Sequence, residues 1–401
     1  MSEMDTLNIC YLEWNSFCDR DMPAVLRGLG QNVIKIHFEG YRMKEEEVER
    51  LLETSLGQSS CDFLFSFNYF PTVSKYCASH HVKYVSWVYD SPHIHVYSYT
   101  VLNPCNYIFL FDYAMYEELR SAGIQTVYYM PLAVNDVKLG ALRNGLEQRK
   151  KYAGEISFVG SLYTEPKNRL YDKFRSISGY ARGYLDGLIQ AQLHVQGYNF
   201  LREMLSGDIV AEMQKAYPTN PNAESAMSPE EIYADYVLAR QVTSIERREI
   251  LEKLGEKHSV NLFTYDRSVC IPGVENKGAV DYDTEMPYIF MNSKISLNIT
   301  LRSIKTGIPL RAFDIMGSGG FLLTNYQEEL FEYFEADKDF VYYTDYGDLT
   351  EKVDYYLLHE EERVQIAQNG CRKVREQHNM RLRVRSILDI VTGERNETAA
   401  V

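Results

Sequence analysis

Residues 295–326 read ISLNITLRSIKTGIPLRAFDIMGSGGFLLTNY. The apolar runs at 295–298 and 321–324 predict two buried strands, because a strand covered on both faces is continuously apolar. Between them lie a basic loop, a short helix and a glycine-rich turn. This order of elements predicts one repeating unit of a parallel α/β sheet.

The loop that enters this helix carries Arg302, Lys305 and Arg311. A helix start offers unpaired backbone N–H groups and positive charge to an anion, and Arg and Lys beside it suit a phosphate or diphosphate. Asp314 follows Arg311 by three residues on the same helical face, where a carboxylate can bind two sugar hydroxyls. The pattern suits a nucleotide. An ordinary αβ unit with a solvated basic loop and a C-cap at Gly317 has the same features.

The chain also resembles a known family, the glycosyltransferases related to the spore-maturation protein CgeB. Similarity to their C-terminal half is carried by Leu297-Asn298-Ile299, Arg311-x-Phe313-Asp314 and Gly317-x-Gly319-Gly320-Phe321-Leu322-Leu323-Thr324. The segment Asn8-Ile9-x-Tyr11-x-x-Trp14 is similar to their N-terminal domain. The resemblance implies an α/β chain of the GT-B fold, with two Rossmann-like, doubly wound domains facing a cleft. It also implies that the C-terminal domain holds a nucleotide-sugar donor.

The turn at Gly160 and Ser161 follows a predicted strand at 156–159. Loops at the carboxyl ends of such strands meet ligands in open α/β sheets. In related transferases this turn approaches the donor phosphates, with an arginine where this chain has Ser161. Lys167 lies slightly downstream and is a further candidate for a phosphate contact.

The resemblance also implies a role for Asp314, in the helix after the basic loop. Many GT-B enzymes use two acidic residues separated by seven others, and Asp314 is similar to the second of them. The first would fall at Thr306, which is not acidic, so that carboxylate is missing or is supplied elsewhere. The turn with Gly317, Gly319 and Gly320 is expected to help neutralise the departing diphosphate. The alternative is that Asp314 is an ordinary solvent-exposed residue on the surface of the helix.

Asp90 and His93 follow an apolar strand in the N-terminal half. A carboxylate and an imidazole at a strand end are candidates for proton transfer, or for stabilising positive charge on a sugar in the transition state. The segment Asp90-Ser91-Pro92 is also a common turn sequence. Both interpretations stay open at this stage.

The metal-binding patterns in the chain are incomplete. Asp-x-Asp occurs at Asp19/Asp21, Asp281/Asp283 and Asp337/Asp339. Roughly one such match is expected by chance in a chain this rich in Asp, so the pattern carries little weight. His93-x-His95 has no Cys or His cluster to complete four ligands. We therefore expect no bound metal and no tightly bound cofactor.

Size and charge limit the classes of function. A chain of 401 residues is long enough for two domains, and its net charge of −14 argues against nucleic acid as a partner. No apolar run approaches the length of a membrane span, and no secretory signal pattern is present. The seven cysteines are scattered without a CxxC pair, which favours free thiols in the cytoplasm. We expect a cytoplasmic protein without a transmembrane segment.

Strand and helix patterns alternate on both sides of a polar run at 135–154, which is a candidate linker. The predicted strands before this run are at 7–12, 33–38, 63–67, 82–89, 107–111 and 127–130, and those after it are at 156–159, 260–263, 295–298, 321–324 and 340–343. We expect an N-terminal Rossmann-like, acceptor-side domain at 1–140 and a C-terminal Rossmann-like, nucleotide-sugar-binding domain at 150–378. The mostly helical stretch at about 171–257 is expected as an insertion in the second domain. Residues 379–401 are expected as a C-terminal helix and tail that can cross back to the first domain.

The sequence thus predicts a metal-independent glycosyltransferase whose donor is a nucleotide-diphosphate sugar, with a UDP-sugar favoured. The acceptor is a protein, a glycan or a small molecule. A nucleotide-sugar 2-epimerase or a phosphorylase on the same fold is one alternative. The other is a non-catalytic sugar or nucleotide binder that partners an active transferase, which the missing acid at Thr306 and the serine at Ser161 would suit.

Overall fold

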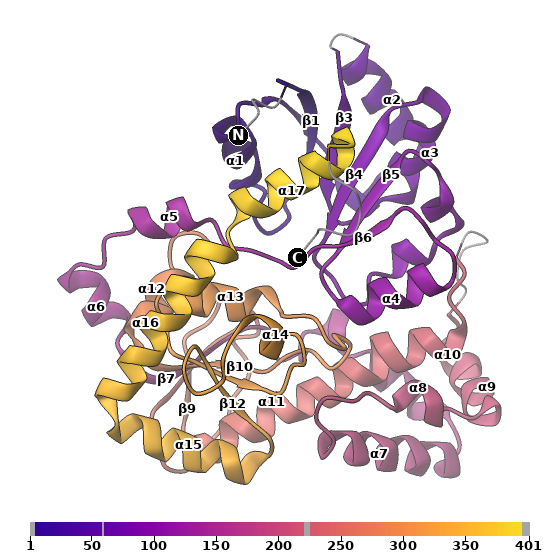
Figure 1. Ribbon diagram of the computed structural model, residues 1–401. Helices are drawn as coiled ribbons and strands as arrows, with labels where there is room; N and C mark the ends of the chain where they lie inside the picture. Colours follow the sequence, from indigo (N-terminus) through magenta and orange to yellow (C-terminus); the bar gives the residue numbers. More distant parts are fainter. Residues whose placement is uncertain (1–4, 58–59, 220–224, 395–401) are drawn as a thin grey trace. The chain divides into compact units, whose positions relative to one another are not determined.

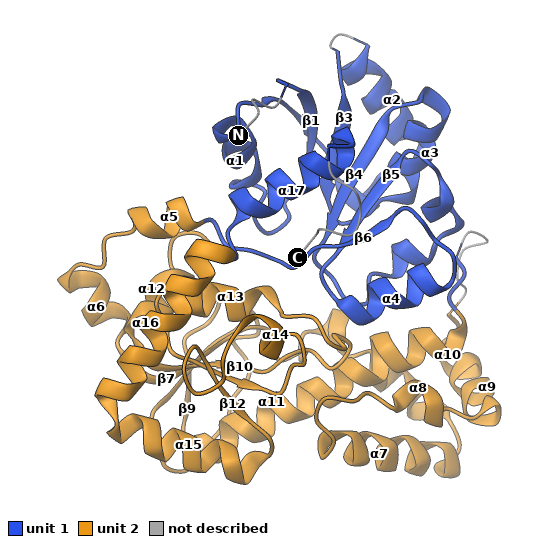
Figure 2. Ribbon diagram, viewed as in Figure 1, with its two compact units in different colours: residues 1–135, 221–227, 378–401 blue, residues 136–220, 228–377 orange. Residues whose placement is uncertain are grey.

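The computed structural model describes residues 5–57, 60–219 and 225–394, and these form two compact units (Figures 1 and 2). Unit 1 comprises residues 5–135, 225–227 and 378–394. Unit 2 comprises residues 136–219 and 228–377. Each unit is built on one six-stranded parallel sheet.

Unit 1 has the sheet order β2-β1-β3-β4-β5-β6, with every neighbouring pair parallel. In that order the strands are β2 (Asn32–His37), β1 (Asn8–Glu13), β3 (Phe63–Phe67), β4 (Lys83–Val88), β5 (Asn106–Leu110) and β6 (Val127–Tyr129). All six were predicted to within about one residue at each end. The doubly wound α/β class expected for this half is confirmed.

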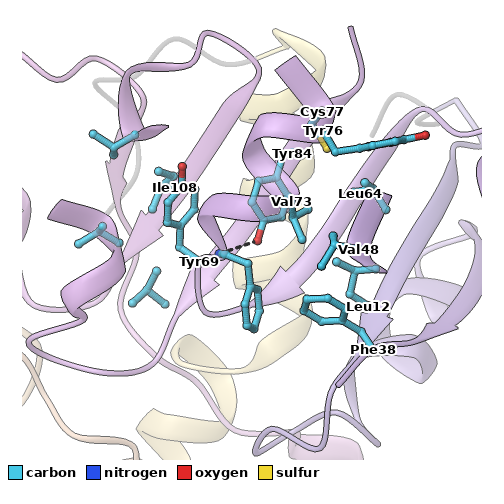
Figure 3. Packing of buried hydrophobic residues seen from close by; sticks show 14 of the residues in the cluster. Leu12, Phe38, Val48, Leu64, Tyr69, Val73, Tyr76, Cys77, Tyr84 and Ile108 are labelled. Carbon is cyan, nitrogen blue, oxygen red and sulfur yellow. Dashed lines mark hydrogen bonds between the residues drawn. The ribbon is translucent and has the colours of Figure 1, made fainter. Parts of the chain in front are cut away.

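Helices cover the sheet of unit 1: α1 (Met22–Gly28), α2 (Glu45–Leu56), α3 (Pro71–His80) and α4 (Tyr113–Ser121). A core cluster that includes Leu12, Phe38 and Val48 fills the space between strands and helices (Figure 3). The Tyr84 hydroxyl lies inside this cluster and accepts the backbone N–H of Phe70 at 3.1 Å, so its polar atom is satisfied.

Helix α17 (Met380–Thr392) comes from the other end of the sequence and packs against α1 in unit 1. Val134 pairs with Asn379 at the start of α17, and Lys83 Nζ donates to the Val391 carbonyl at 2.7 Å near its end. Residues 395–401 of the expected tail lie outside the described residues.

Unit 2 has the sheet order β12-β11-β10-β7-β8-β9, again entirely parallel. Its strands are β12 (Val341–Tyr343), β11 (Leu322–Asn325), β10 (Ser293–Asn298), β7 (Gly154–Val159), β8 (Val260–Phe263) and β9 (Val274–Asn276). The two strands expected within 295–326 are therefore β10 and β11, and they pair directly. The short edge strand β9 was not predicted.

The remaining helices of unit 2 divide between the sheet and the insertion. Around the sheet are α12 (Met286–Asn292), α13 (Leu310–Gly317), α14 (Leu330–Tyr333), α15 (Tyr346–Leu358) and α16 (Glu360–Gln377). In the insertion are α7 (Gly179–Leu193), α8 (Leu201–Met204), α9 (Gly207–Ala216), α10 (Pro229–Glu231), the π-helical segment η6 (Ile232–Leu238) and α11 (Ala239–Gly255). The insertion has a core of its own, with Phe174, Leu185 and Tyr233 fully buried.

The run at 135–154, expected as a linker, folds as α5 (Asp136–Ala141) and α6 (Leu146–Tyr152). Helix α6 packs on α12, where the Tyr152 ring stacks on Tyr288 and its hydroxyl donates to Glu285 Oε1 at 2.9 Å. Tertiary packing thus orders a segment whose polar composition alone favours a loop.

Candidate functional site

Helix α13 carries two of the candidate site residues, Arg311 and Asp314. It begins at Leu310, and its residues Ala312, Phe313, Ile315 and Met316 are buried. In a parallel sheet the connecting helix runs opposite to the strands, so the start of α13 lies at the edge where β7 and β10 end. This edge brings Arg311 together with the turn that begins at Gly160.

Arg311 lies directly against Gly160. A Cβ atom on residue 160 would stand 2.7 Å from Arg311 Nη2, so a larger residue there would displace the end of the Arg311 side chain. The guanidinium also lies over the ring of Phe158, with Cζ 5.5 Å from the ring centre. The sequence predicted both Gly160 and Arg311 as candidates, and the structure brings them into contact.

The Arg311 guanidinium forms no ion pair within the described parts of the chain, although the negative charge of Asp314 acts on it. Among the described residues, its largely buried guanidinium makes no hydrogen bond or ion pair with an acidic side chain. Burial and the neighbouring Arg247 lower the pKa of Arg311 to about 10, so it stays protonated at pH 7. Desolvating a cation without a counter-ion is costly, and a bound anion would offset that cost. The position is therefore suited to an anionic ligand.

Arg311 is one end of an alternating stack of arginine and aromatic side chains, which we call the arginine ladder. In order its members are Arg311, Phe158, Arg247, Tyr163, Arg240 and Tyr236. Successive distances from guanidinium carbon to ring centre are 5.5, 5.3, 5.1, 5.3 and 4.2 Å. These distances lie in the range of cation–π attraction.

The middle of the ladder is fixed by the backbone. Arg247 Nε donates to the Ile299 carbonyl at 3.1 Å, and its Nη1 donates to the Ser161 carbonyl at 2.6 Å. Tyr163 has φ +58°, and its N–H donates to Ser161 Oγ at 2.8 Å. The turn after β7 is thus tied to helix α11 and to the end of β10.

The side chains of Ser161 and Lys167 are not part of the arginine ladder. The Ser161 hydroxyl donates to the Glu165 carboxylate at 3.0 Å, which places a negative charge rather than a positive one beside that residue. Lys167 is exposed on a 3₁₀ turn, Pro166–Asn168.

The sequence suggested that the Arg302 guanidinium is free to bind a phosphate, but the structure gives it a different environment. It is buried, and Nε and Nη2 donate to the two oxygens of Glu246 at 2.8 and 2.7 Å. Its Nη1 donates to the Val195 carbonyl at 2.8 Å. Arg302 therefore fastens the loop after β10 to the insertion, and its charge is already compensated by Glu246. Lys305 lies half-buried in the same loop.

Gly317, Gly319 and Gly320 lie at the opposite edge of the sheet from Arg311, because they end α13 and precede β11. They cannot share a diphosphate with it. A Cβ on Gly320 would stand 2.9 Å from the Phe290 carbonyl, and Gly319 has φ +87°. These two glycines permit close packing and a left-handed turn.

Asp314 is nearly buried one turn after Arg311, and its Oδ1 accepts the hydroxyl of Tyr282 at 3.1 Å. The position expected for a paired acid, Thr306, donates its Oγ1 to Glu329 Oε1 at 2.8 Å. Glu329 is buried and lies in the loop after β11. A carboxylate therefore does lie beside Thr306. It belongs to Glu329 in the loop after β11, and the spacing from Asp314 does not point to it.

In unit 1, Asp90 follows β4 with 65% of its side chain exposed. The Asn68 amide holds it, with Nδ2 donating to Asp90 Oδ2 at 2.8 Å and Oδ1 accepting the Tyr89 N–H at 2.8 Å. Asn68 has φ +58°, a conformation that Asn adopts more readily than most residues. The carboxylate is thus both positioned and accessible.

His93 is buried beside Asp90, with Nδ1 3.9 Å from Asp90 Oδ2. Its Nε2 lies within 3.2 Å of the Tyr69 backbone N–H and 3.1 Å of the Tyr41 hydroxyl. Burial lowers the pKa of His93, and the Asp90 carboxylate opposes that shift without cancelling it. Of the two residues, Asp90 is the one that presents a group to a ligand.

Five residues near these positions were not singled out from the sequence: Tyr163, Arg240, Arg247, Tyr282 and Glu329. The spacing of seven between Arg240 and Arg247 places both on one face of a helix, a signal that could have been used. The described residues contain no group of three or more His, Cys, Asp or Glu side chains arranged to hold a metal.

Comparisons with known proteins agree with this architecture. A family model described as glycosyl transferase-like matches residues 240–389. No curated protein sequence matches the chain. Among the helices that the structure describes, none combines the length and apolar character needed to cross a membrane.

Solved structures of low sequence identity share the fold. Sucrose-phosphate synthase from Thermosynechococcus elongatus has a TM-score of 0.56 at 7% identity, covering 97% of this chain and 100% of that one. A glycosyltransferase from Rickettsia africae has a TM-score of 0.53 at 11% identity, covering 97% and 99%. HepE of Anabaena, in complex with UDP and glucose, has a TM-score of 0.52 at 10% identity, covering 96% and 100%. The fold is therefore GT-B, with two Rossmann-like units.

Proposed function

We propose that the chain is a glycosyltransferase of the CgeB-like type, which moves a sugar from a nucleoside diphosphate sugar to an acceptor hydroxyl or similar nucleophile. The observation that carries the proposal is the protonated guanidinium of Arg311, which lies against Gly160 and makes no ion pair with any described residue. Further support comes from the glycosyl transferase-like match over residues 240–389. UDP is the favoured nucleotide, since the structurally similar HepE was solved with UDP and glucose.

Arg311 would neutralise the charge that builds up on the departing diphosphate, and the bare backbone at Gly160 would let a phosphate approach. Lys305 and Lys167 are proposed to add positive charge around it. Asp314 would bind the hydroxyls of the donor ribose, with the Tyr282 hydroxyl fixing one of its oxygens. Because Arg302 is paired with Glu246, we assign it the task of holding the loop after β10 in place.

Asp90 is proposed to act on the acceptor side, either by accepting its proton or by stabilising positive charge on the sugar ring. Asn68 and His93 would then be positioning residues, because both contact Asp90 and neither is exposed.

The experiment that tests the proposal is incubation with UDP-, GDP-, CMP- and dTDP-sugars, with free nucleotide, thermal shift and conversion of the sugar as readouts. A transferase releases nucleotide, and faster with acceptor present. A 2-epimerase changes the sugar at C2 without needing an acceptor. A non-catalytic binder gives a thermal shift alone. Absence of any shift or release with every donor would refute the proposal.

Donor binding is expected to need no divalent metal, because the proposed diphosphate contacts come from Arg311 and nearby lysines. Calorimetric titration with UDP should give the same dissociation constant, within about twofold, in EDTA and in magnesium or manganese. A strict requirement for either metal ion would contradict the proposal.

Replacing Asp314 by asparagine should raise the donor KM by about tenfold, the scale of one hydrogen bond to a charged group, with a smaller effect on kcat. Asp314 would contact the ribose equally in the ground and transition states, so its loss weakens binding more than chemistry. Initial rates over a range of donor concentrations measure both constants. Asp172→Asn, in an exposed ion pair with Arg175, is the control. An unchanged KM would remove Asp314 from the donor site.

A further inference from the structure

Arg240 forms the far end of the arginine ladder from Arg311. It lies in the first turn of α11, so the helical insertion supplies it. Its guanidinium is stacked between two rings, with Cζ 4.2 Å from the centre of Tyr236 and 5.3 Å from that of Tyr163. Stacking on both faces fixes the plane of the guanidinium and leaves its N–H groups directed outward from the stack.

The hydrogen-bonding capacity of Arg240 is largely unused. Its Nε is buried without a hydrogen-bond partner, and its Nη1 makes one long bond, 3.4 Å, to the uncharged Asn168 Oδ1. Of the nearby acids, Glu165 accepts hydrogen bonds from Ser161 and Asn168, and Asp266 accepts them from Thr164 and Ser268. Within the described parts of the chain, Arg240 has no ion pair with an acidic residue.

We expect Arg240 and Arg311 to bind different groups of a ligand, because they are opposite ends of the ladder. Phe158, Arg247 and Tyr163 stand between the two guanidinium groups, and Arg247 is held in place by backbone carbonyls. A single phosphate contacted by Arg311 therefore leaves Arg240 without an anion. The two ends of the ladder are two separate positions for negative charge.

We propose that Arg240 forms a second anion subsite, which binds an oxyanion carried by a sugar. This oxyanion is either a carboxylate on the sugar of the donor or a phosphate on a sugar acceptor. The proposal rests on the proposed function, because it places this subsite beside a bound nucleotide. A preorganised arginine suits both groups, since its planar fork matches carboxylate and phosphate oxygens.

The test is calorimetric titration of the full chain as wild type, Arg240→Met and Arg248→Met. Methionine keeps an apolar stem between the tyrosines and removes the charge. Arg248 is the matched control, an exposed arginine of α11 whose Nη2 donates to the Cys270 carbonyl at 3.3 Å. The donor arm compares UDP-glucuronate with UDP-glucose. The acceptor arm compares glucose 6-phosphate with glucose, with and without saturating UDP.

In one arm the wild type should bind the anionic sugar at least about tenfold tighter than its neutral counterpart, the scale of a charge-assisted hydrogen bond. Arg240→Met should abolish that preference and leave UDP affinity within about twofold. Arg248→Met should change neither. The arm in which the preference is found identifies whether the charge belongs to the donor or to the acceptor.

Three results would overturn the subsite: no preference for the anionic sugar in either arm, a preference that persists in Arg240→Met, or a loss of UDP affinity in Arg240→Met. The last result would make Arg240 part of the diphosphate site. If Arg240→Met does not fold, as judged by thermal unfolding, Arg240→Lys keeps the charge without the fork and should retain only part of the preference. If wild type binds no UDP compound, the proposed donor site fails, and the acceptor arm without UDP then decides the subsite alone.

Discussion

Replacing Arg311 by methionine is expected to lower kcat by about a hundredfold, the scale found when one preorganised charged or hydrogen-bonding stabiliser is removed. Negative charge accumulates on the diphosphate as the bond to the sugar breaks. The protonated Arg311 beside Gly160 is the group proposed to stabilise that charge. Steady-state rates at saturating donor measure this effect. The stem volume is kept, so the packing on Phe158 should remain.

The same substitution should leave the thermal unfolding temperature unchanged or raise it. Arg311 is a partly buried cation that forms no ion pair with a described residue, so its charge opposes folding and removing that charge relieves the cost. Loss of activity with retained stability therefore separates a functional role from a structural one. Arg248→Met should alter neither property. If Arg311→Met keeps wild-type kcat, or loses activity only because it unfolds, the diphosphate site is not at Arg311.

Replacing Asp90 by alanine is expected to reduce turnover by about 100- to 10,000-fold, the range for loss of a general acid or base. Nucleotide affinity should stay within about twofold, because the proposed nucleotide contacts all come from unit 2 whereas Asp90 belongs to unit 1. Calorimetry with UDP and single-turnover rates, measured on the same preparation, test both halves of this expectation.

Asp62→Ala provides the comparison for Asp90, because Asp62 is an exposed aspartate that precedes β3 at the other edge of the same sheet. It should retain full turnover. Full activity of Asp90→Ala would remove the acceptor-side assignment. A large loss of UDP affinity in that variant would show instead that Asp90 takes part in donor binding.

Local sequence patterns were sufficient to predict most of the strands and helices. Eleven of the twelve strands in the described residues were anticipated, most of them because parallel strands buried on both faces are continuously apolar. Strand β9 was not anticipated, since Val274–Asn276 is short, mostly polar and pairs on only one side. The segment at 135–154 appeared to be a linker by composition, and its helices α5 and α6 depend partly on packing against α12.

The candidate site was harder to predict from the sequence, because its residues come together only in the tertiary structure. Arg302 has an ordinary basic-loop context in sequence, and only the fold brings Glu246 to it. Gly317 lies close to Arg311 in sequence, yet α13 carries the chain across to the opposite edge of the sheet between them. The juxtaposition of Arg311 with Gly160 joins segments far apart in the chain, and the resemblance rather than the spacing indicated it.

The packing of α17 in unit 1 has a consequence for the order in which the protein can be assembled. A ribosome makes the six strands of unit 1 before unit 2, and makes α17 after unit 2. The surface of α1 that α17 covers, and Lys83, which donates to the Val391 carbonyl, therefore remain without these partners until unit 2 and α17 have been synthesised. Unit 2 is synthesised as a nearly uninterrupted stretch and can complete its own sheet earlier. Unit 1 is thus translated before unit 2 but acquires all of its native contacts after it, which reverses the usual N-terminal-first order for these two units.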